Sequence, residues 1–247
     1  AAGLASCGNT VFASSFAMFA TGRAYEQVRN SIGYTHLNVK ICATHAGITL
    51  GEDGASHQSI EDIALMRAIP GMTVIQPCDD IETKQVIKAI SKINGPCYVR
   101  LGRSAVDTVN TEDYVFELGK GSVLRKGKDI TLVATGMMVQ QALLAANTLS
   151  EQGIEVNVIN IHTIKPLDET LILEYAKQSK LIVTCEEHSK FGGLGSAVAE
   201  TLSKNYPMKL AMVAVNDTFG ESGTPNALIE KYGLTAKDIV KTVLESI

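Results

Sequence analysis

Two histidines and two carboxylates fall within one short, glycine-rich stretch of this 247-residue chain. The stretch is T-H-A-G-I-T-L-G-E-D-G-A-S-H-Q, residues 44–58, and it carries His45, Glu52, Asp53 and His57. Imidazole gains and loses a proton near neutral pH, and carboxylates accept hydrogen bonds from hydroxyl groups. Its three glycines let the backbone adopt conformations that side chains disfavour. We interpret this stretch as the wall of an active site; the other interpretation is a polar surface loop.

A strand and a helix are predicted to position this loop. Residues 39–44 are short, apolar and followed by a turn signal, which predicts a strand. Residues 59–69 predict a helix, with Ser59 as its N-cap and acidic residues in its first turn. The loop therefore follows the carboxyl end of a strand, where open α/β sheets bind their ligands.

The remainder of the first half also alternates between strand and helix patterns. Strands are predicted at 73–76 and 97–101, and apolar spacing predicts a helix at 80–93. Residues 102–128 hold turn residues and show little periodicity. We expect a connection between two units there, with a short strand near 120–124.

The second half repeats the alternation more clearly. We predict strands at 130–134, 155–159, 180–184 and 210–214, and helices at 138–152, 167–177, 196–204 and from 235 to the end. Strands that alternate with helices at this spacing are typical of βαβ units. They predict an α/β fold with mostly parallel sheets covered by helices on both faces.

Charge and composition exclude several classes of protein. The formal net charge is −4 without a basic run, so nucleic-acid or anionic-membrane binding has no electrostatic basis. The five cysteines occur singly, which argues against a disulfide scaffold or a zinc ribbon and suits a reducing compartment. No apolar run reaches membrane-spanning length and no signal peptide is visible, so we expect a cytoplasmic protein.

The loop motif G-E-D-G-A-S-H-Q, preceded by T-H-A-G, resembles the pyrimidine-domain loop of transketolases, which are thiamine diphosphate enzymes. Other matching segments follow in the same order along the chain, at 15–29, 76–79, 98–103, 135–136, 162–168 and 186–200. The resemblance implies two tandem three-layer α/β/α domains. We expect a pyrimidine-binding domain at 1–110, truncated at its N-terminus, and the transketolase C-terminal domain at 111–247.

The resemblance also implies roles for the polar residues of the loop. Transketolases move a two-carbon ketol unit between phosphorylated sugars, and His45 and His57 would contact hydroxyl groups near the reacting carbon. Asp53 would recognise a sugar hydroxyl. Arg103, which follows a predicted strand and a glycine, would bind the sugar phosphate, because a guanidinium donates two parallel hydrogen bonds to phosphate oxygens.

Phe16 and Phe19 share a helix face, and aromatic residues at this spacing are usually part of a core. The resemblance implies that both line the aminopyrimidine pocket of the cofactor, with Phe19 as the stacking ring. Offset stacking of two flat rings contributes about 0.5–1.5 kcal/mol beyond area burial.

Two features of the second half receive no catalytic role. G-G-L-G at 192–195 lacks the full G-x-G-x-x-G spacing, so we interpret it as a tight structural turn rather than a phosphate loop. Glu186, Glu187 and His188 form a polar cluster at a predicted strand end. In the resembled family the C-terminal domain is distant from the cofactor and mainly supports assembly.

Two parts of a working transketolase are not matched in this sequence. The activating glutamate of the family lies just before the segment that matches residues 1–4, and the diphosphate-binding domain with its Gly-Asp-Gly motif has no counterpart. Residues 51–54 are not that motif, and no metal ligands are expected here. The resemblance is to the second polypeptide of a split transketolase. Its N-terminal subunit would hold the diphosphate and Mg²⁺ or Ca²⁺.

Assembly and pathway follow from the same resemblance. The chain would dimerise through its pyrimidine-binding and C-terminal domains and form a heterotetramer with the N-terminal subunit, acting on sugar phosphates of the pentose phosphate pathway.

Two alternatives remain open. One is a related enzyme, a deoxyxylulose-phosphate synthase or a 2-oxo acid dehydrogenase β subunit; His45 and Glu52 favour transketolase, because the synthases typically lack both. The other is a non-catalytic, truncated relative. The missing glutamate favours it. The joint presence of five residues argues against it: Phe19, His45, Asp53, His57 and Arg103.

Overall fold

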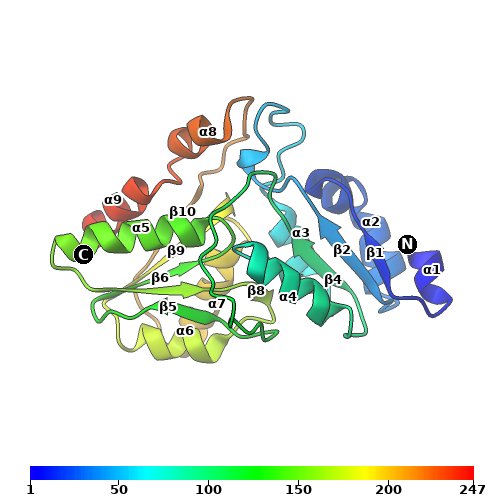
Figure 1. Ribbon diagram of the computed structural model, residues 1–247, viewed down its shortest axis with the longest axis horizontal. Helices are drawn as coiled ribbons and strands as arrows, with labels where there is room; N and C mark the ends of the chain where they lie inside the picture. The colour runs from blue at the N-terminus through cyan, green and yellow to red at the C-terminus, as the bar shows by residue number, and fades with distance from the viewer.

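Four short apolar strands build a parallel sheet in the first half of the chain. The computed structural model describes all residues, 1–247. The strands lie in the order β1 (Val11–Ala13), β2 (Val39–Ala43), β4 (Cys97–Arg100) and β3 (Thr73–Ile75), each parallel to its neighbour. A fifth strand, β8 (Thr163–Lys165), completes the edge (Figure 1).

Strand β8 is antiparallel to β3 and comes from the second half of the sequence. Ile75 pairs with Thr163, and Val74 pairs with Lys165. The ammonium group of Lys165 also donates to the carbonyl oxygens of Arg67 (2.7 Å) and Ile69 (2.6 Å). Residues 162–168 were not predicted to form a strand, so the participation of the second half in the first sheet is a finding of the structure. The predicted domain division at residue 110 stays a prediction.

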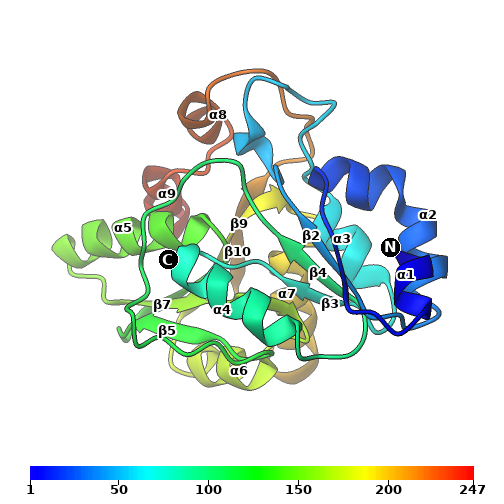
Figure 2. The ribbon, with the colours of Figure 1, turned by 45° about the vertical axis from the view of Figure 1, so that its right-hand side comes forward.

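Helices cover both faces of the first sheet. Val86 and Ile90 of α4 (Asp80–Ile90) pack with Ile75 on one face. Ile63 and Met66 of α3 (Asp62–Ala68) pack with β2 and β3 on the other. Figure 2 shows α3 and α4 on opposite sides of the sheet. The remaining local elements of this half are α1 (Ala2–Ser6), α2 (Tyr25–Gln27), the π-helical segments Met18–Arg23 and Val28–Gly33, and the 3₁₀ turn Ile48–Leu50.

The second sheet has the strand order β10 (Leu210–Val215), β9 (Leu181–Ser189), β6 (Ile130–Ala134), β7 (Val156–Asn160) and β5 (Ser122–Arg125). Only the edge strand β5 is antiparallel to its neighbour. The predicted α/β fold with two mostly parallel sheets is confirmed.

Successive residues of a buried strand face opposite layers, and β6 shows this directly. Leu132 packs in the cluster formed with α5 (Met138–Glu151) and α9 (Ala236–Ser246). Val133 packs in the cluster formed with α6 and α7 on the other face. The remaining helices are α6 (Glu169–Ala176), α7 (Leu194–Asn205) and α8 (Pro225–Lys231).

The observed N-terminal cap agrees with the prediction for α9 and differs from it for α3. Thr235 and Asp238 form the predicted capping box of α9. Helix α3, however, begins at Asp62 and not at the predicted Ser59. The cause is backbone pairing, because the carbonyl oxygen of Ser59 accepts from Gly47 N (2.8 Å) and this segment is bridged to the loop after β2.

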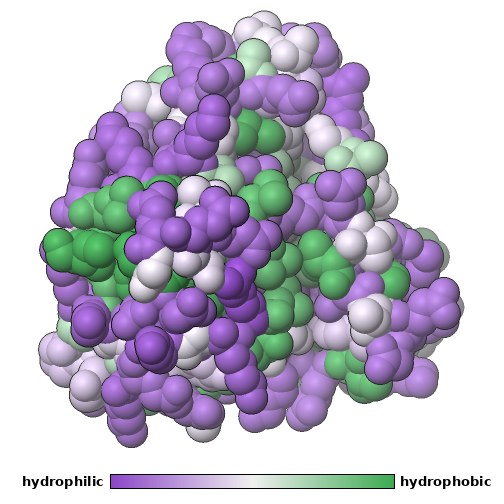
Figure 3. All heavy atoms as spheres, turned by 60° about the vertical axis from the view of Figure 1, so that its left-hand side comes forward, coloured by the Kyte–Doolittle hydropathy of each residue, from purple (hydrophilic) through white to green (hydrophobic).

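None of the helices is long and apolar enough to cross a lipid bilayer. The face in Figure 3 is mainly hydrophilic, and the hydrophobic side chains visible on it gather in separate patches.

Candidate active site

The loop after β2 adopts a backbone that ordinary residues disfavour. All three glycines have positive φ, and at Gly47 (φ +83°) an added Cβ would lie 2.3 Å from the Glu187 carboxyl group. His45 also has positive φ, +61°, although it carries a side chain. Such a conformation costs about 1–3 kcal/mol and persists only where the surroundings enforce it. The backbone at His45 is therefore held by its contacts.

Pairing between two distant segments brings aromatic rings to this loop. Phe16 forms a parallel bridge with Thr44, and this places its ring on His45. The two ring centroids are 4.0 Å apart with planes at 9°. Phe19 meets His57 edge to face, with centroids 5.2 Å apart and planes at 81°. Four of the six predicted site residues thus form one cluster of partly exposed rings.

A hydroxyl group next to each histidine in the sequence fixes one ring nitrogen. Nδ1 of His45 is hydrogen-bonded to Oγ1 of Thr44, and Nδ1 of His57 to Oγ of Ser56, each at 2.9 Å. Nε2 of each imidazole stays available for another partner. We did not single out these hydroxyl residues in the sequence, although their adjacency to the histidines is a signal that could have found them.

Arg103 reaches the same loop from the end of β4. Its Nη1 donates to the carbonyl oxygen of Leu50 (2.5 Å) and pairs with Glu52 (3.0 Å). The pKa of Glu52 is lowered, first by its own backbone N–H and further by Arg103. Both side chains are exposed, so the pair contributes little to stability. Asp53 is exposed and makes no side-chain hydrogen bond to the other five residues.

Arg23 is a further site residue that the sequence analysis did not select. Its guanidinium carbon lies 4.6 Å from the centroid of the Phe19 ring, a cation–π geometry. The spacing of four residues between Phe19 and Arg23 places them on one helix face, and this was the available signal.

The structure brings four of the six predicted residues into contact, Phe16, Phe19, His45 and His57, whereas Arg103 contacts Leu50 and Glu52, and Asp53 stands exposed. A cavity of about 470 Å³ lies beside this cluster, lined by Met18, Ser56 and Gln58 together with Phe219 of the segment after β10. A second cavity of about 440 Å³ lies behind the loop and is bordered by Thr49 and Glu187. None of the six lines either cavity.

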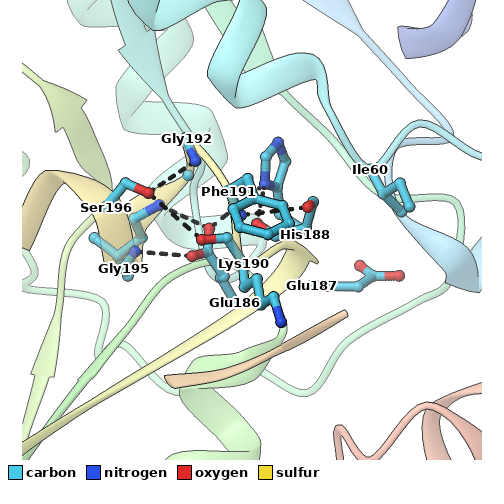
Figure 4. A network of polar contacts seen from close by, with 12 residues as sticks. Ile60, Glu186, Glu187, His188, Lys190, Phe191, Gly192, Gly195 and Ser196 are labelled. Atoms are coloured by element: carbon cyan, nitrogen blue, oxygen red, sulfur yellow. Dashed lines mark hydrogen bonds and ion pairs between the residues drawn. The ribbon is translucent and has the colours of Figure 1, made fainter. Parts of the chain in front are cut away.

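The turn at 192–195 has a structural role. The Glu186 carboxylate accepts from Leu194 N (2.7 Å) and Gly195 N (2.8 Å), at the start of α7 (Figure 4). The position that a phosphate would take at this helix N-terminus is therefore filled by a side chain of the chain itself.

Comparison with known proteins places this geometry in a family. The model of the transketolase pyrimidine binding domain matches residues 1–108, and that of the transketolase C-terminal domain matches residues 119–239. A putative transketolase C-terminal section from Methanocaldococcus jannaschii is 51% identical, over 99% of this chain and 78% of that protein. The chain belongs to the transketolase family.

The relatives also show which part of a transketolase this chain resembles. A 6-deoxy-6-sulfo-D-fructose transketolase subunit, SqwH, from a Clostridium species is 46% identical, over 99% of this chain and 76% of the subunit. A solved structure described as a split gene transketolase, inactive β4 tetramer, matches with a TM-score of 0.94 and 53% identity. The match includes all of this chain and 79% of the chain in that structure. The chain accordingly belongs with the C-terminal subunits of split transketolases.

Proposed function

We propose that this chain is the C-terminal subunit of a thiamine diphosphate-dependent transketolase that transfers a two-carbon ketol unit between phosphorylated sugars. The observation that carries the proposal is the contact of His45 with Phe16 and of His57 with Phe19 on one open wall. Groups that pass protons near neutral pH lie there directly against flat apolar rings.

The aromatic residues fit the aminopyrimidine ring of thiamine diphosphate. Phe16 already stacks on a planar imidazole at 4.0 Å, and Phe16 and Phe19 lie nearly parallel, with planes at 11°. A surface that accepts one planar ring suits another of similar size. Phe16 and Phe19 would hold the pyrimidine. When bound, the cofactor supplies the nucleophilic carbon that takes up the two-carbon unit.

The polar residues of the wall have separate tasks in this proposal. Nε2 of His45 and of His57 would hydrogen-bond to substrate hydroxyls and pass protons near the reacting carbon. Asp53 would accept a hydrogen bond from a sugar hydroxyl. Arg103 would exchange its exposed partner Glu52 for the terminal anionic group of the sugar, because an exposed ion pair is worth less than about 1 kcal/mol.

A partner subunit is part of the proposal. The four rings are partly exposed, and Asp53 and Arg103 are also reachable from outside, which supports a site completed by a second chain. The description of the 53%-identical structure as an inactive β4 tetramer supports the view that such subunits alone lack activity. We propose a cytoplasmic heterotetramer acting in the pentose phosphate pathway. Its diphosphate-binding subunits hold the diphosphate and Mg²⁺ or Ca²⁺.

The test is ketol transfer by this chain co-purified with a subunit that carries the diphosphate-binding domain. We expect calorimetric binding of thiamine diphosphate to the complex, and transfer from xylulose 5-phosphate that is absent with pyruvate as donor. A parallel assay with 6-deoxy-6-sulfo-D-fructose compares a terminal sulfonate with a terminal phosphate at Arg103. Cofactor binding with turnover of pyruvate only would favour the synthase or dehydrogenase alternative. A complex that binds no cofactor would favour the non-catalytic one.

A further inference from the structure

Two adjacent buried glutamates at the end of β9 point in opposite directions (Figure 4). Side chains alternate along a strand, so Glu186 is directed to α7, which packs on the same sheet as β9. Glu187 is directed the other way, to the loop that follows β2 of the first sheet. A residue of the second sheet therefore reaches the segment that carries His45 and His57.

The contact of Glu187 with this loop is direct. Its Oε1 accepts a hydrogen bond of 2.7 Å from Thr49 N, in the middle of the loop. Its carboxyl group also lies against Gly47, where a Cβ would approach within 2.3 Å. Glu187 is 2% exposed and Thr49 is 1% exposed. A hydrogen bond to a carboxylate is stronger than one between neutral groups.

Buried neighbours hold Glu187 in place. Arg100 donates to its main-chain carbonyl oxygen (3.0 Å) and is itself bound to the carboxylate of Asp62 (2.7 Å). Burial raises the pKa of the Glu187 carboxyl, while the Arg100 charge and the Thr49 N–H oppose that rise. A buried carboxylate is expensive to keep unless its hydrogen bonds are made, and Thr49 N is its hydrogen-bonding partner from the loop.

The loop has further anchors and borders a cavity. Nε2 of Gln58 donates to the carbonyl oxygens of Ile48 and Glu221, each at 2.9 Å. The cavity of about 440 Å³ borders both Thr49 and Glu187. Without the Glu187 contact, Gly47 and Thr49 lose their tie to the second sheet and can shift toward this cavity, although Gln58 and Arg103 still bind the carbonyl oxygens of Ile48 and Leu50.

We propose that Glu187 is a positioning residue. By accepting the Thr49 N–H, it holds the loop of residues 44–58 so that His45 stays stacked on Phe16 and His57 stays against Phe19. Its catalytic consequence rests on the proposed transketolase function, whereas its effect on the loop does not. The second sheet thereby takes part in shaping the site on the first.

The test compares variants in the complete enzyme with its partner subunit. Glu187→Met keeps the side-chain length and removes the acceptor. We expect hydrogen–deuterium exchange in peptides covering 44–58 to accelerate roughly tenfold or more, and kcat to fall about tenfold with the KM for the sugar within about twofold. Glu187→Gln keeps an acceptor oxygen, and it should restore most of the exchange protection and of kcat.

Glu186→Ala is the matched control, because it removes a neighbouring buried carboxylate that contacts α7 instead of the loop. It should leave exchange at 44–58 and kcat unchanged. If Glu187→Met does not fold, Glu187→Asp retains the charge but retracts it from Thr49 N, and the same acceleration is expected.

Unchanged exchange in the folded acceptor-free or retracted variant would overturn the proposal, as would equal effects of Glu187→Gln and Glu187→Met. If the wild-type complex shows no ketol transfer, the proposed function fails, and the exchange measurements still decide whether Glu187 holds the loop.

Discussion

The imidazole rings of the candidate site are oriented from two sides. Thr44 and Ser56 bind one nitrogen of His45 and of His57, while a phenylalanine from the Phe16–Phe19 segment contacts each ring. This arrangement leaves little rotational freedom before any ligand binds, and preorganised groups are the ones that assist a reaction most. It also explains why the strained backbone of His45 is tolerated.

Arg103→Gln tests the anion-binding role. The complete enzyme should show a KM for phosphorylated donor that rises roughly tenfold to hundredfold, since a charge-assisted hydrogen bond is lost, with kcat changed less than threefold. Thermal stability should fall only slightly, because the Arg103–Glu52 pair is exposed and one hydrogen bond to the Leu50 carbonyl oxygen is lost. Arg29→Gln, at an exposed arginine on another segment, is the control for both measurements. An unchanged KM would remove Arg103 from the site.

His162 gives a pH-dependent stability. It is buried against the Phe116 ring, and burial lowers its pKa to about 4, with Asp168 opposing that shift. Between pH 6.5 and 4 the unfolded chain therefore binds a proton that the folded chain does not. Acidification through this window should cost about 2–3 kcal/mol of unfolding free energy.

His162→Gln should show a smaller loss of stability than the wild type when urea unfolding is compared at pH 6.5 and pH 4.5. Parallel curves for the two proteins would mean that His162 carries a proton in the folded state.

The aromatic cluster was only partly predictable from sequence. Residue type and spacing were enough to predict the two histidines and Asp53 as site residues. The stacking of His45 on Phe16 could not be predicted, because it depends on the bridge between Phe16 and Thr44 in another segment. The role of Glu187 was not recognised either, because its partner Thr49 lies 138 residues away in the chain. The sequence alone does not separate Arg100 from Arg103 as a ligand-binding residue, and burial beside Asp62 shows that Arg100 belongs to the interior.

At the scale of elements, strands that alternate with helices were easier to place than a strand formed through pairing alone: β3 was predicted at 73–76, and β8 was not. The predicted strand at 130–134 coincides with β6, and the predicted helix at 80–93 contains all of α4 and extends three residues beyond its end. β8 was missed because it follows β7 with no helix between them, and its three residues form a strand through pairing with β3. The short helix α8 was also not predicted.

The start of α7 provides an element-scale prediction. Glu186→Ala removes the acceptor for two buried backbone N–H groups, so the free energy of unfolding should fall by about 1–3 kcal/mol. Urea unfolding measures this loss, and Glu174→Ala, at an exposed glutamate on α6, is the control. A loss equal to that of the control would show that the N–H groups of α7 find other partners.

At the scale of the whole molecule, the two sheets are joined by buried polar contacts. Arg100 is bound to Asp62 on α3, to the Ser59 carbonyl oxygen and to that of Glu187 on β9. Lys165 and Arg67 add further contacts between the halves, and Arg67 donates to the Gly192 carbonyl oxygen (2.7 Å). We expect one cooperative unfolding transition for the chain.

Arg100→Met tests the link between the sheets. It leaves Asp62 buried without its counter-charge, and breaking such a pair costs about 3–5 kcal/mol. Urea unfolding should show this loss, whereas Lys84→Met, in the exposed pair with Asp80, should change stability little. A loss no greater than that of the control would mean that the interior rearranges around Asp62.

The antiparallel strand β8 limits how this chain can be divided or recombined. A fragment that ends near residue 110 lacks Thr163–Lys165, so one side of β3 would present unpaired backbone groups. Open strand edges are templates for pairing with other molecules, and such a fragment is expected to aggregate. A chimaera that joins the first half of this chain to the second half of a relative inherits a foreign β8. Whether its first sheet forms then depends on how well three residues far from the junction, those of β8, pair with β3.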